Sequence, residues 1–190
     1  AKQGIWEKVH NHLRDLARLK AGKKKPRPLR SLTAKAFAQL ATPEFVVMMR
    51  VRKLQEENDS LVDTLGFILL LHVTSADVQD RDGARLLLLE KLKKAFGWLQ
   101  VIWADGGYTG KLVGEIAAIV RHRRLRLEII KRSDNVKGFK ILPKRWIVER
   151  TFGWFIQSRR LVRDYEVLPL HSESMIYLAM SKIMLRRISA

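Results

Sequence analysis

Hydrophobic and polar positions change their spacing along the chain, and this spacing predicts two kinds of segment. Near the N-terminus, apolar residues recur at helical intervals with charges between them, so we expect an amphipathic helix that ends near Gly22. These residues are Ile5, Val9, Leu13, Leu16 and Leu19. His10 and His12 lie two residues apart in the same segment, so they point to different faces of a helix, and we expect both on the surface.

From residue 61 onward, short apolar runs alternate with stretches of helical periodicity. The run 61–75 predicts a β-hairpin whose two strands are joined through Asp63, Thr64, Leu65 and Gly66. Further strands are expected over 98–105 and 125–130, and helices over 84–96, 106–124, 143–160 and about 171–187. This order is typical of an α/β layer architecture.

The stretch "ATPEFVVMMRV" at 41–51 has the local signals of a helix start. Thr42 is a suitable N-cap, Pro43 suits the first turn, and Glu44 would lie near the positive end of the helix dipole. We therefore predict a helix at this position.

The charge of the chain points to a polyanionic partner. Thirty-seven Lys and Arg residues against 19 Asp and Glu give a formal net charge of +18, and neutralisation of phosphates by such residues supplies most non-specific affinity for nucleic acid. A merely solvated basic surface is the alternative. The basic residues cluster at Lys23–Lys25, Arg121–Arg124 and Arg159–Arg160, and the first cluster belongs to a proline-broken segment that reads as a linker or arm.

Several classes of protein are excluded by composition. The chain has no cysteine, which excludes disulfides and thiolate metal sites. The longest strongly apolar run, 65–73, is too short to span a membrane. The N-terminal segment has the charges of an amphipathic helix and lacks the apolar core of a signal peptide.

Two carboxylates stand at positions where chemistry is expected. Asp105 ends a predicted strand and is followed by Gly106 and Gly107, and ligands of open α/β sheets bind at the carboxyl ends of strands. A simple helix-capping role is the alternative reading of Asp105. Glu149 lies in a predicted helix among apolar neighbours, where an acid is costly to bury unless it is paired or holds a metal. Arg145, four residues earlier, could form a structural ion pair with Glu149.

A carboxylate from a strand end and one from a helix could together bind Mg²⁺ for phosphoryl transfer. Such a site usually needs a third carboxylate. The acids on the hairpin and the loop after it look more like turn and capping residues; they are Asp63, Asp77, Asp80 and Asp82.

Three stretches together resemble the catalytic domain of insertion-sequence transposases of the DDE type. They are "VIWADGGYTG", "KGFKILPKRWIVERTFGWF" and "SRRLVRDYE". Residues 61–84 and the N-terminal "GIWEKVHNHLR" resemble the same proteins, so the likeness spans nearly the whole chain except about 31–60. It implies an RNase H-like fold in which three acids hold two Mg²⁺ ions that activate the attacking oxygen and stabilise the leaving oxygen at a transposon end.

By this resemblance, Asp105 is similar to the second acid of the family and Glu149 to the third, with Mg²⁺ bound to both. Arg145 resembles the arginine that precedes the third acid, whereas Leu142 and Ile156 stand where many members carry a tyrosine and a basic residue. DNA is the implied partner, as transposon end and as target, with a homo-oligomer on DNA and no membrane, in the bacterial cytoplasm at the nucleoid. The residues expected to contact DNA are Lys23, Lys24, Lys25, Lys131, Arg132, Lys137, Arg145, Arg159 and Arg160.

The first acid of the family should lie on the opening strand of the sheet in a motif like Asp-Ser-Gln-Ser-Val, and the chain has no such motif. Permissible codons for "LTAKAF" at 32–37, read from the third base, spell this motif. The same shift applied to "PEFVVMMRV" permits Gly-Ile-Arg-Gly-Tyr-Asp-Ala-Gly, which is similar to what the family carries next. We therefore expect about 31–60 to be translated out of frame between two compensating indels.

The expected organisation is an N-terminal helix at 1–22 as the remnant of an upstream region, a basic linker and out-of-frame segment at 23–60, and an RNase H-like catalytic domain remnant at 61–190. In this hypothesis the first central strand is replaced by a helix-prone segment, and the transposase is catalytically defective. Two alternatives stay open: a non-catalytic basic nucleic-acid-binding protein, and a different Mg²⁺-dependent nuclease in which Asp63 or another acid completes the site.

Overall fold

The computed structural model describes residues 4–23, 44–52, 56–75, 99–105, 114, 126–130, 145–163 and 165–190. Its helices are α1 (Ile5–Lys20), α6 (Arg145–Ile156), α7 (Arg159–Val162) and α8 (Pro169–Ser189). Its strands are β1 (Glu44–Arg52), β2 (Glu56–Asp63), β3 (Ile68–Ser75), β4 (Leu99–Asp105) and β5 (Arg126–Ile130). The predicted hairpin, the strands ending near residues 105 and 130, and the C-terminal helix are all confirmed.

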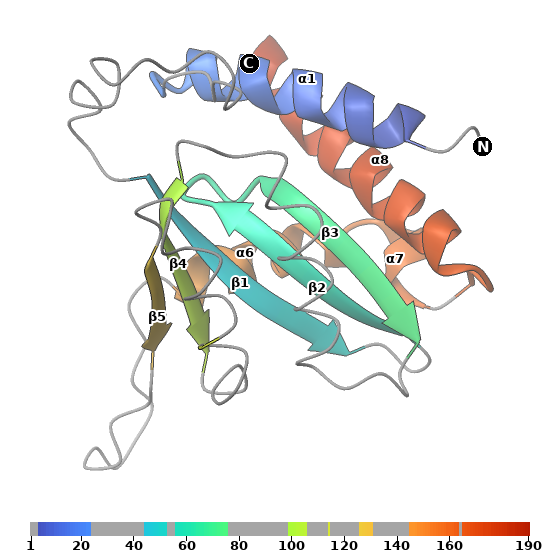
Figure 1. Cartoon of the computed structure of the whole chain (residues 1–190). Coiled ribbons are helices and arrows are strands. Elements are labelled where there is room, and N and C mark those ends of the chain that lie inside the picture. The colour runs from blue at the N-terminus through green and yellow to red at the C-terminus, as the bar shows by residue number, and fades with distance from the viewer. Residues whose placement is uncertain are drawn as a thin grey trace.

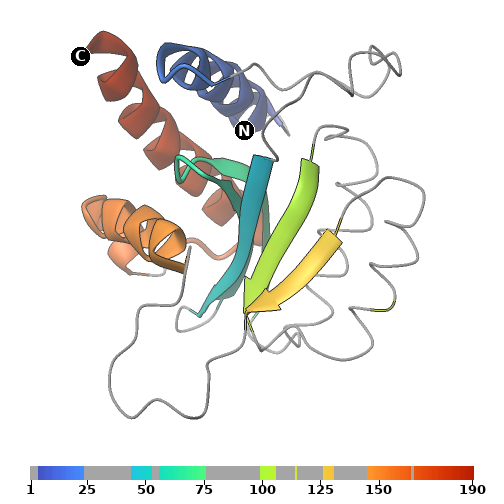
Figure 2. The ribbon, with the colours of Figure 1, turned by 90° about the vertical axis from the view of Figure 1, so that its left-hand side faces the viewer.

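The five strands form one mixed sheet in the order β3-β2-β1-β4-β5 (Figure 1). β1 is antiparallel to β2 and parallel to β4, and β4 is parallel to β5. Helices α1, α6 and α8 lie on the same side of this sheet (Figure 2). The α/β class expected from the sequence is therefore confirmed, and β1 occupies the centre of the sheet.

The prediction of a helix over 41–51 is wrong, because residues 44–52 form the central strand β1. Val46 pairs with Asp63 of β2 on one side and with Ile102 of β4 on the other. The sequence of β1, EFVVMMRVR, is rich in valine and carries a phenylalanine, which suit a strand flanked by partners on both sides. The expectation that a helix-prone segment replaces the first central strand is thus also wrong. Pairing with two neighbours outweighs the local signals of a helix start.

The core lies between the sheet and the helices on that side of it. Four consecutive residues of β4, Val101 to Ala104, are buried, and since their side chains alternate, both faces of this strand are covered. Val101 and Trp103 belong to one cluster with Ile147 and Val148 of α6. Buried residues of α8 complete the same cluster; they include Ile176, Tyr177, Met180 and Met184. This packing fixes α6 against the face of the central strands.

The turn between β2 and β3 is held by Asp63, the last residue of β2. The Asp63 carboxylate accepts hydrogen bonds from the backbone N–H groups of Leu65 and Phe67, each at 2.9 Å. Gly66 has a left-handed φ of 84°, and the Thr151 hydroxyl of α6 donates a hydrogen bond to its carbonyl oxygen at 2.8 Å. The turn is therefore fixed both by its own aspartate and by α6.

Helix α1 confirms the N-terminal helix predicted from the sequence. The side of the helix that is buried, however, is not its apolar side. Its buried residues are His10, Arg14, Ala17 and Arg18, while most of its large apolar side chains are exposed. The expectation of a surface His10 is wrong, whereas His12 is exposed as expected. The physical reason is an ion pair between Arg18 and the buried Asp63, which turns the polar side of α1 toward the sheet.

The helix predicted over 143–160 is divided in two. α6 ends at Ile156 with a tighter turn, in which Ser158 donates its backbone N–H to the carbonyl of Phe155 at 2.8 Å, and α7 begins after Ser158. Within the described ranges, no helix combines the length and the apolar character that crossing a membrane requires.

Candidate active site

Asp105 is the last residue of β4, at the carboxyl end of a buried strand, as the sequence predicts. Its backbone pairs with Ile130 of β5, and the preceding residue Ala104 pairs with Met48 of β1. β1 and β5 both run parallel to β4; β4 and β5 end together at this edge, while β1 continues beyond Met48 to Arg52. This is the edge at which ligands bind in open α/β sheets.

Glu149 lies in the first half of α6, and its side chain is exposed. The expectation that this acid is costly to bury therefore does not apply, because the buried residues of α6 are Ile147, Val148, Thr151 and Phe155 and do not include Glu149. Ile147 and Val148 share the core with Trp103, which precedes Asp105 by two positions. Packing of α6 on the sheet thus holds Glu149 with its carboxylate open to solvent.

Strand β1 carries no acid next to Asp105. Its only acidic residue, Glu44, pairs with Leu99 at the opposite end of β4. Asp105 lies six positions after Leu99, which corresponds to about 20 Å along a strand. At this end of β4, Asp105 pairs with Ile130 of β5, and Ala104 pairs with Met48 of β1.

Asp63, the acid proposed to complete a nuclease site, is engaged elsewhere. Its side chain is 1% exposed, forms an ion pair with Arg18, and accepts the two backbone hydrogen bonds of the turn. Its register partner on β1 is Val46, two residues before Met48 and therefore toward the start of β4. Asp63 ends β2, which lies two strands away from β4, and its side chain is engaged by the hairpin turn and by Arg18 of α1.

A cation–π cluster lies on α6 beside Glu149. The Arg150 guanidinium is 4.5 Å from the ring centroid of Trp146 and 5.1 Å from that of Trp154. Arg187 of α8 is 4.3 Å from the same Trp154 ring. Burial lowers the pKa of Arg150, and the charge of Arg187 lowers it further. Trp146 is nevertheless 46% exposed, so an aromatic face and a guanidinium stand next to Glu149.

The basic residues predicted to bind DNA are only partly described. Lys23 is exposed after the end of α1, and Arg159 and Arg160 are exposed in α7. The Nε atom of Arg160 is 2.7 Å from the Glu166 carboxylate. Arg145 begins α6. Lys24, Lys25, Lys131, Arg132 and Lys137 lie outside the described residues.

Sequence reasoning missed the arginines that the fold brings together. Arg18 meets Asp63, and Arg150 and Arg187 share Trp154. The spacing of His10, Arg14 and Arg18 at four-residue intervals was a signal for one polar face of α1. The partner Asp63 lies 45 residues further along the chain, so only the fold reveals the pair.

A mixed α/β domain with an acid at the end of a central strand and another on the helix packed beside it defines a candidate phosphoryl-transfer core. Residues 59–181 match the family model described as "Transposase DDE domain". The match covers more than half of the chain, and the chain therefore belongs to this family. The RNase H-like fold that the sequence resemblance implies agrees with the mixed five-stranded sheet. No curated protein gives a significant match.

Solved structures with a similar arrangement include retroviral integrases. The catalytic core domain of BIV integrase is 12% identical, with a TM-score of 0.46 over 76% of this chain and 82% of that one. The HTLV-2 integrase catalytic core domain in complex with magnesium is 14% identical, with a TM-score of 0.41 over 74% and 84%. A simian T-cell lymphotropic virus intasome in complex with PP2A regulatory subunit B56 gamma is 15% identical, with a TM-score of 0.42 over 79% of this chain and 53% of that one.

Proposed function

We propose that this chain is the core of a DDE-type DNA transposase whose strand cleavage and transfer are impaired because the first acid is missing. Membership of the transposase DDE domain family gives the reaction class, which is phosphoryl transfer. In this proposal Asp105 is the second acid and Glu149 the third. A helix cap for Asp105 and a structural ion pair for Glu149 would each account for one acid only, whereas the family resemblance accounts for both.

The observation that carries the proposed defect is the absence from the sequence of any motif like Asp-Ser-Gln-Ser-Val. The codon comparison places that motif at 32–37, before β1, and the only acid of β1 itself, Glu44, pairs with Leu99 at the far end of β4. The family match begins at residue 59, after β1. Both observations support a segment at about 31–60 that is read out of frame, as the codon comparison suggests. In this proposal the carboxylate of the first acid is absent, and no acid of β1 takes its place beside Asp105.

The residues present fit one Mg²⁺ better than two. Mg²⁺ is commonly held by one or two carboxylates, with water or phosphate oxygens completing its octahedron, and Asp105 and Glu149 would supply these two carboxylates. A two-metal site needs further ligands between the ions. Among the residues that the structure describes, no group of three or more acids and histidines is placed to hold a metal. When bound, the ion would supply charge stabilisation at a phosphodiester, and the protein's part would be to fix the two carboxylates.

DNA binding follows from the family and from the charge of +18. The exposed Arg159 and the neighbouring α7 residues lie just after α6, the helix that carries Glu149. Contacts from this side would hold the phosphate backbone next to the two acids. Such contacts position DNA without reading its sequence.

The decisive experiment compares this chain with a version in which residues 31–60 are restored to the shifted frame. Both are incubated with Mg²⁺ and a duplex that carries the inverted repeats flanking the coding sequence, and cleavage and joining are measured. We expect products only from the restored chain, and their loss in its Asp105→Asn and Glu149→Gln variants. Equal activity of both chains would overturn the proposed defect.

A second candidate function is non-catalytic nucleic-acid binding, which the net charge of +18 favours. It predicts that Asp105→Asn and Glu149→Gln change nothing measurable even in the restored chain. Titration of Mg²⁺ by calorimetry separates the two candidates without relying on turnover. Heat of binding that is lost in both variants supports the transposase core, and no heat in any version supports the binding protein.

A further inference from the structure

The cation–π cluster of α6 extends to two other elements. Trp146, Arg150 and Trp154 are spaced four positions apart, so they line one side of α6. Arg187 of α8 lies 4.3 Å from the centroid of the Trp154 ring and 5.2 Å from that of Phe67, in the turn between β2 and β3. The cluster is therefore a continuous series of alternating rings and guanidinium groups that runs from α6 to the hairpin.

The two arginines of this cluster form no ion pair with any acid that the structure describes. Desolvation by burial lowers the pKa of both Arg150 and Arg187, and the charge of Arg187 lowers that of Arg150 further. The charge of Asp63 acts in the opposite direction, but this carboxylate is already paired with Arg18. Two like charges are thus held together, and an anion that contacts both would offset their repulsion.

Stacking leaves the hydrogen-bonding edges of the two guanidinium groups available. A guanidinium carries five N–H donors in one plane, and contact of its face with an aromatic ring uses none of them. The Nε atom of Arg150 is buried and has no hydrogen-bond partner, and Arg187 is exposed. The rings also hold each planar group in place, so less side-chain freedom is lost when a ligand binds. Such edges match the paired oxygens of a phosphate.

The cluster begins next to an acid of the candidate active site. Trp146 precedes Glu149 by three positions and is therefore its neighbour on the surface of α6. Arg150 follows Trp146 by one helical turn, and Arg187 lies beyond it on the far side of the series. A DNA strand with a phosphodiester at Glu149 can therefore continue over the cluster.

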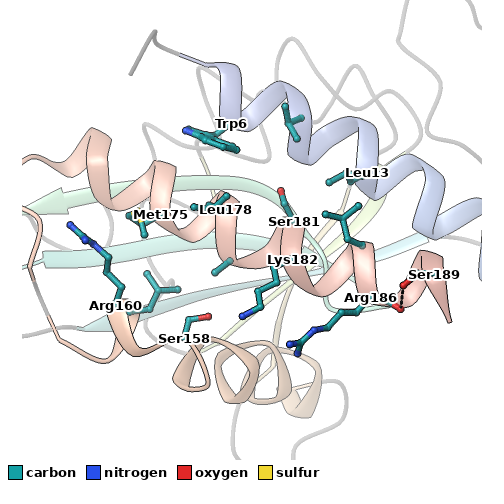
Figure 3. A pocket seen from close by; sticks show the side chains of 14 residues that line it. Trp6, Leu13, Ser158, Arg160, Met175, Leu178, Ser181, Lys182, Arg186 and Ser189 are labelled. Atoms are coloured by element: carbon teal, nitrogen blue, oxygen red, sulfur yellow. Dashed lines mark hydrogen bonds between the residues drawn. The ribbon is translucent and has the colours of Figure 1, made fainter.

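Further cations lie on the helix that carries Arg187. Lys182 and Arg186 are exposed, and both extend from α8 away from Trp6 and Leu13 of α1 (Figure 3). Neither forms an ion pair with an acid in the described part of the chain. An anionic ligand longer than a single phosphate thus meets more positive charge next to Arg187, which favours a polymer such as a DNA strand.

We propose that Arg150 and Arg187 form a phosphate clamp for the DNA strand that extends from Asp105 and Glu149. The inference rests on the proposed function, because it takes its ligand from the phosphodiester chemistry of that site. Both guanidinium groups adjoin the single ring of Trp154. A DNA strand carries one phosphate per about 3.4 Å of helix axis, so one phosphate or two adjacent ones span the pair. The clamp positions the strand and takes no part in the chemical step.

The first test measures binding of the full chain to a labelled duplex by fluorescence anisotropy over a salt series. The slope of log affinity against log salt should fall by about 1 in Arg150→Gln and in Arg187→Gln, and by about 2 in the double variant. Lys8→Gln is the matched control, because it removes one exposed charge of α1 outside the cluster, and it should keep the wild-type slope. Thermal melting followed by circular dichroism checks each fold. Arg187 is exposed, so its variant carries the test if Arg150→Gln unfolds.

The second test locates the contact on the DNA. Short duplexes with the inverted repeat, each with one phosphate replaced by an uncharged methylphosphonate, are titrated with the wild-type chain. Positions at which affinity falls mark the phosphates in contact. At one position or two adjacent ones, this loss should disappear in Arg187→Gln, because the partner of that phosphate is already missing. Lys8→Gln should keep every loss.

A polyglutamate peptide of similar charge tests an acidic protein as the ligand instead. Carboxylates on a flexible chain lack the spacing of DNA phosphates, so we expect weak binding that Arg187→Gln does not change. Binding as tight as that of DNA, and lost in the same variant, would assign the two arginines to a protein partner and overturn the clamp.

Two further outcomes would overturn the inference. One is a wild-type salt slope in the double variant, and the other is a set of methylphosphonate losses that all persist in Arg187→Gln. Both leave the proposed transposase function intact, because that function is decided by Mg²⁺ binding to Asp105 and Glu149 and by the activity of the restored chain. A wild-type chain that binds no duplex at any salt concentration would overturn the clamp and the proposed function together.

Discussion

Arg18 of α1 and Asp63 at the end of β2 form a buried ion pair across 45 residues of sequence. Asp63 is also the acceptor for two backbone N–H groups of the hairpin turn. We predict that Arg18→Met lowers the free energy of unfolding by about 3 to 5 kcal/mol, because it leaves a buried carboxylate without its cation. Urea denaturation measures this loss. Arg163→Met, at an exposed arginine after α7, is the matched control and should change stability by less than about 0.5 kcal/mol.

The contact between Gly66 and α6 gives a second prediction. Gly66 has a φ of 84°, and a Cβ atom there would lie 2.8 Å from the Thr151 hydroxyl oxygen and 3.0 Å from the Trp154 ring. Gly66→Ala should destabilise the fold by about 2 to 5 kcal/mol, the sum of left-handed strain and overpacking.

Gly22 is the natural control for that variant. Its φ is also positive, at 72°, but nothing lies within 4 Å of its Cβ position. Gly22→Ala should therefore cost only the backbone strain of about 1 to 2 kcal/mol. Equal losses for the two variants, measured by the same denaturant titration, would contradict the packing of the turn on α6.

His10 gives the fold a dependence on pH. Burial, and to a smaller extent the neighbouring charge of Arg14, lower the pKa of His10 to about 3. Its ring lies 4.9 Å from that of Tyr177 on α8. The unfolded chain takes up the proton near pH 6.5, so stability is intact above that pH and falls as the pH decreases from 6.5 toward 3.

Unfolding free energies measured across this range test the assignment. His10→Leu should remove most of the dependence of the unfolding free energy on pH below pH 6.5, since no buried imidazole remains to protonate. His12→Leu replaces an exposed histidine two positions away and should keep the slope. A slope that survives in His10→Leu would place its origin in another group.

The central strand shows what local sequence signals cannot predict. Thr42, Pro43 and Glu44 favour a helix start over a few residues, but β1 is determined by its neighbours, because Val46 has partners in both β2 and β4. Strand preference reflects such cross-strand contacts more than local propensity. Strands β4 and β5 were predictable because their apolar runs are short and bounded. The position of Asp105 at a strand end followed from the same signal.

Helix α1 shows a second limit. Its apolar periodicity predicted the helix correctly, but periodicity alone assigns the apolar side to the core. The buried side is instead set by Arg18 and its partner Asp63, a non-local contact. Glu149 was likewise located on its helix from the motif, whereas its exposure depends on how α6 packs through Ile147 and Val148.

The basic residues of α7 provide a final prediction about DNA. Arg159 is exposed, and the Arg160 guanidinium is 2.7 Å from Glu166. If Arg159 neutralises a phosphate, Arg159→Gln should reduce the slope of log affinity against log salt by about 1. Glu166→Gln releases Arg160 for a further phosphate contact, so it should leave the slope unchanged or make it steeper. Fluorescence anisotropy with a labelled duplex over a salt series measures both. The same slope in wild type and Arg159→Gln would indicate that DNA binds through other basic clusters of the chain and not through α7.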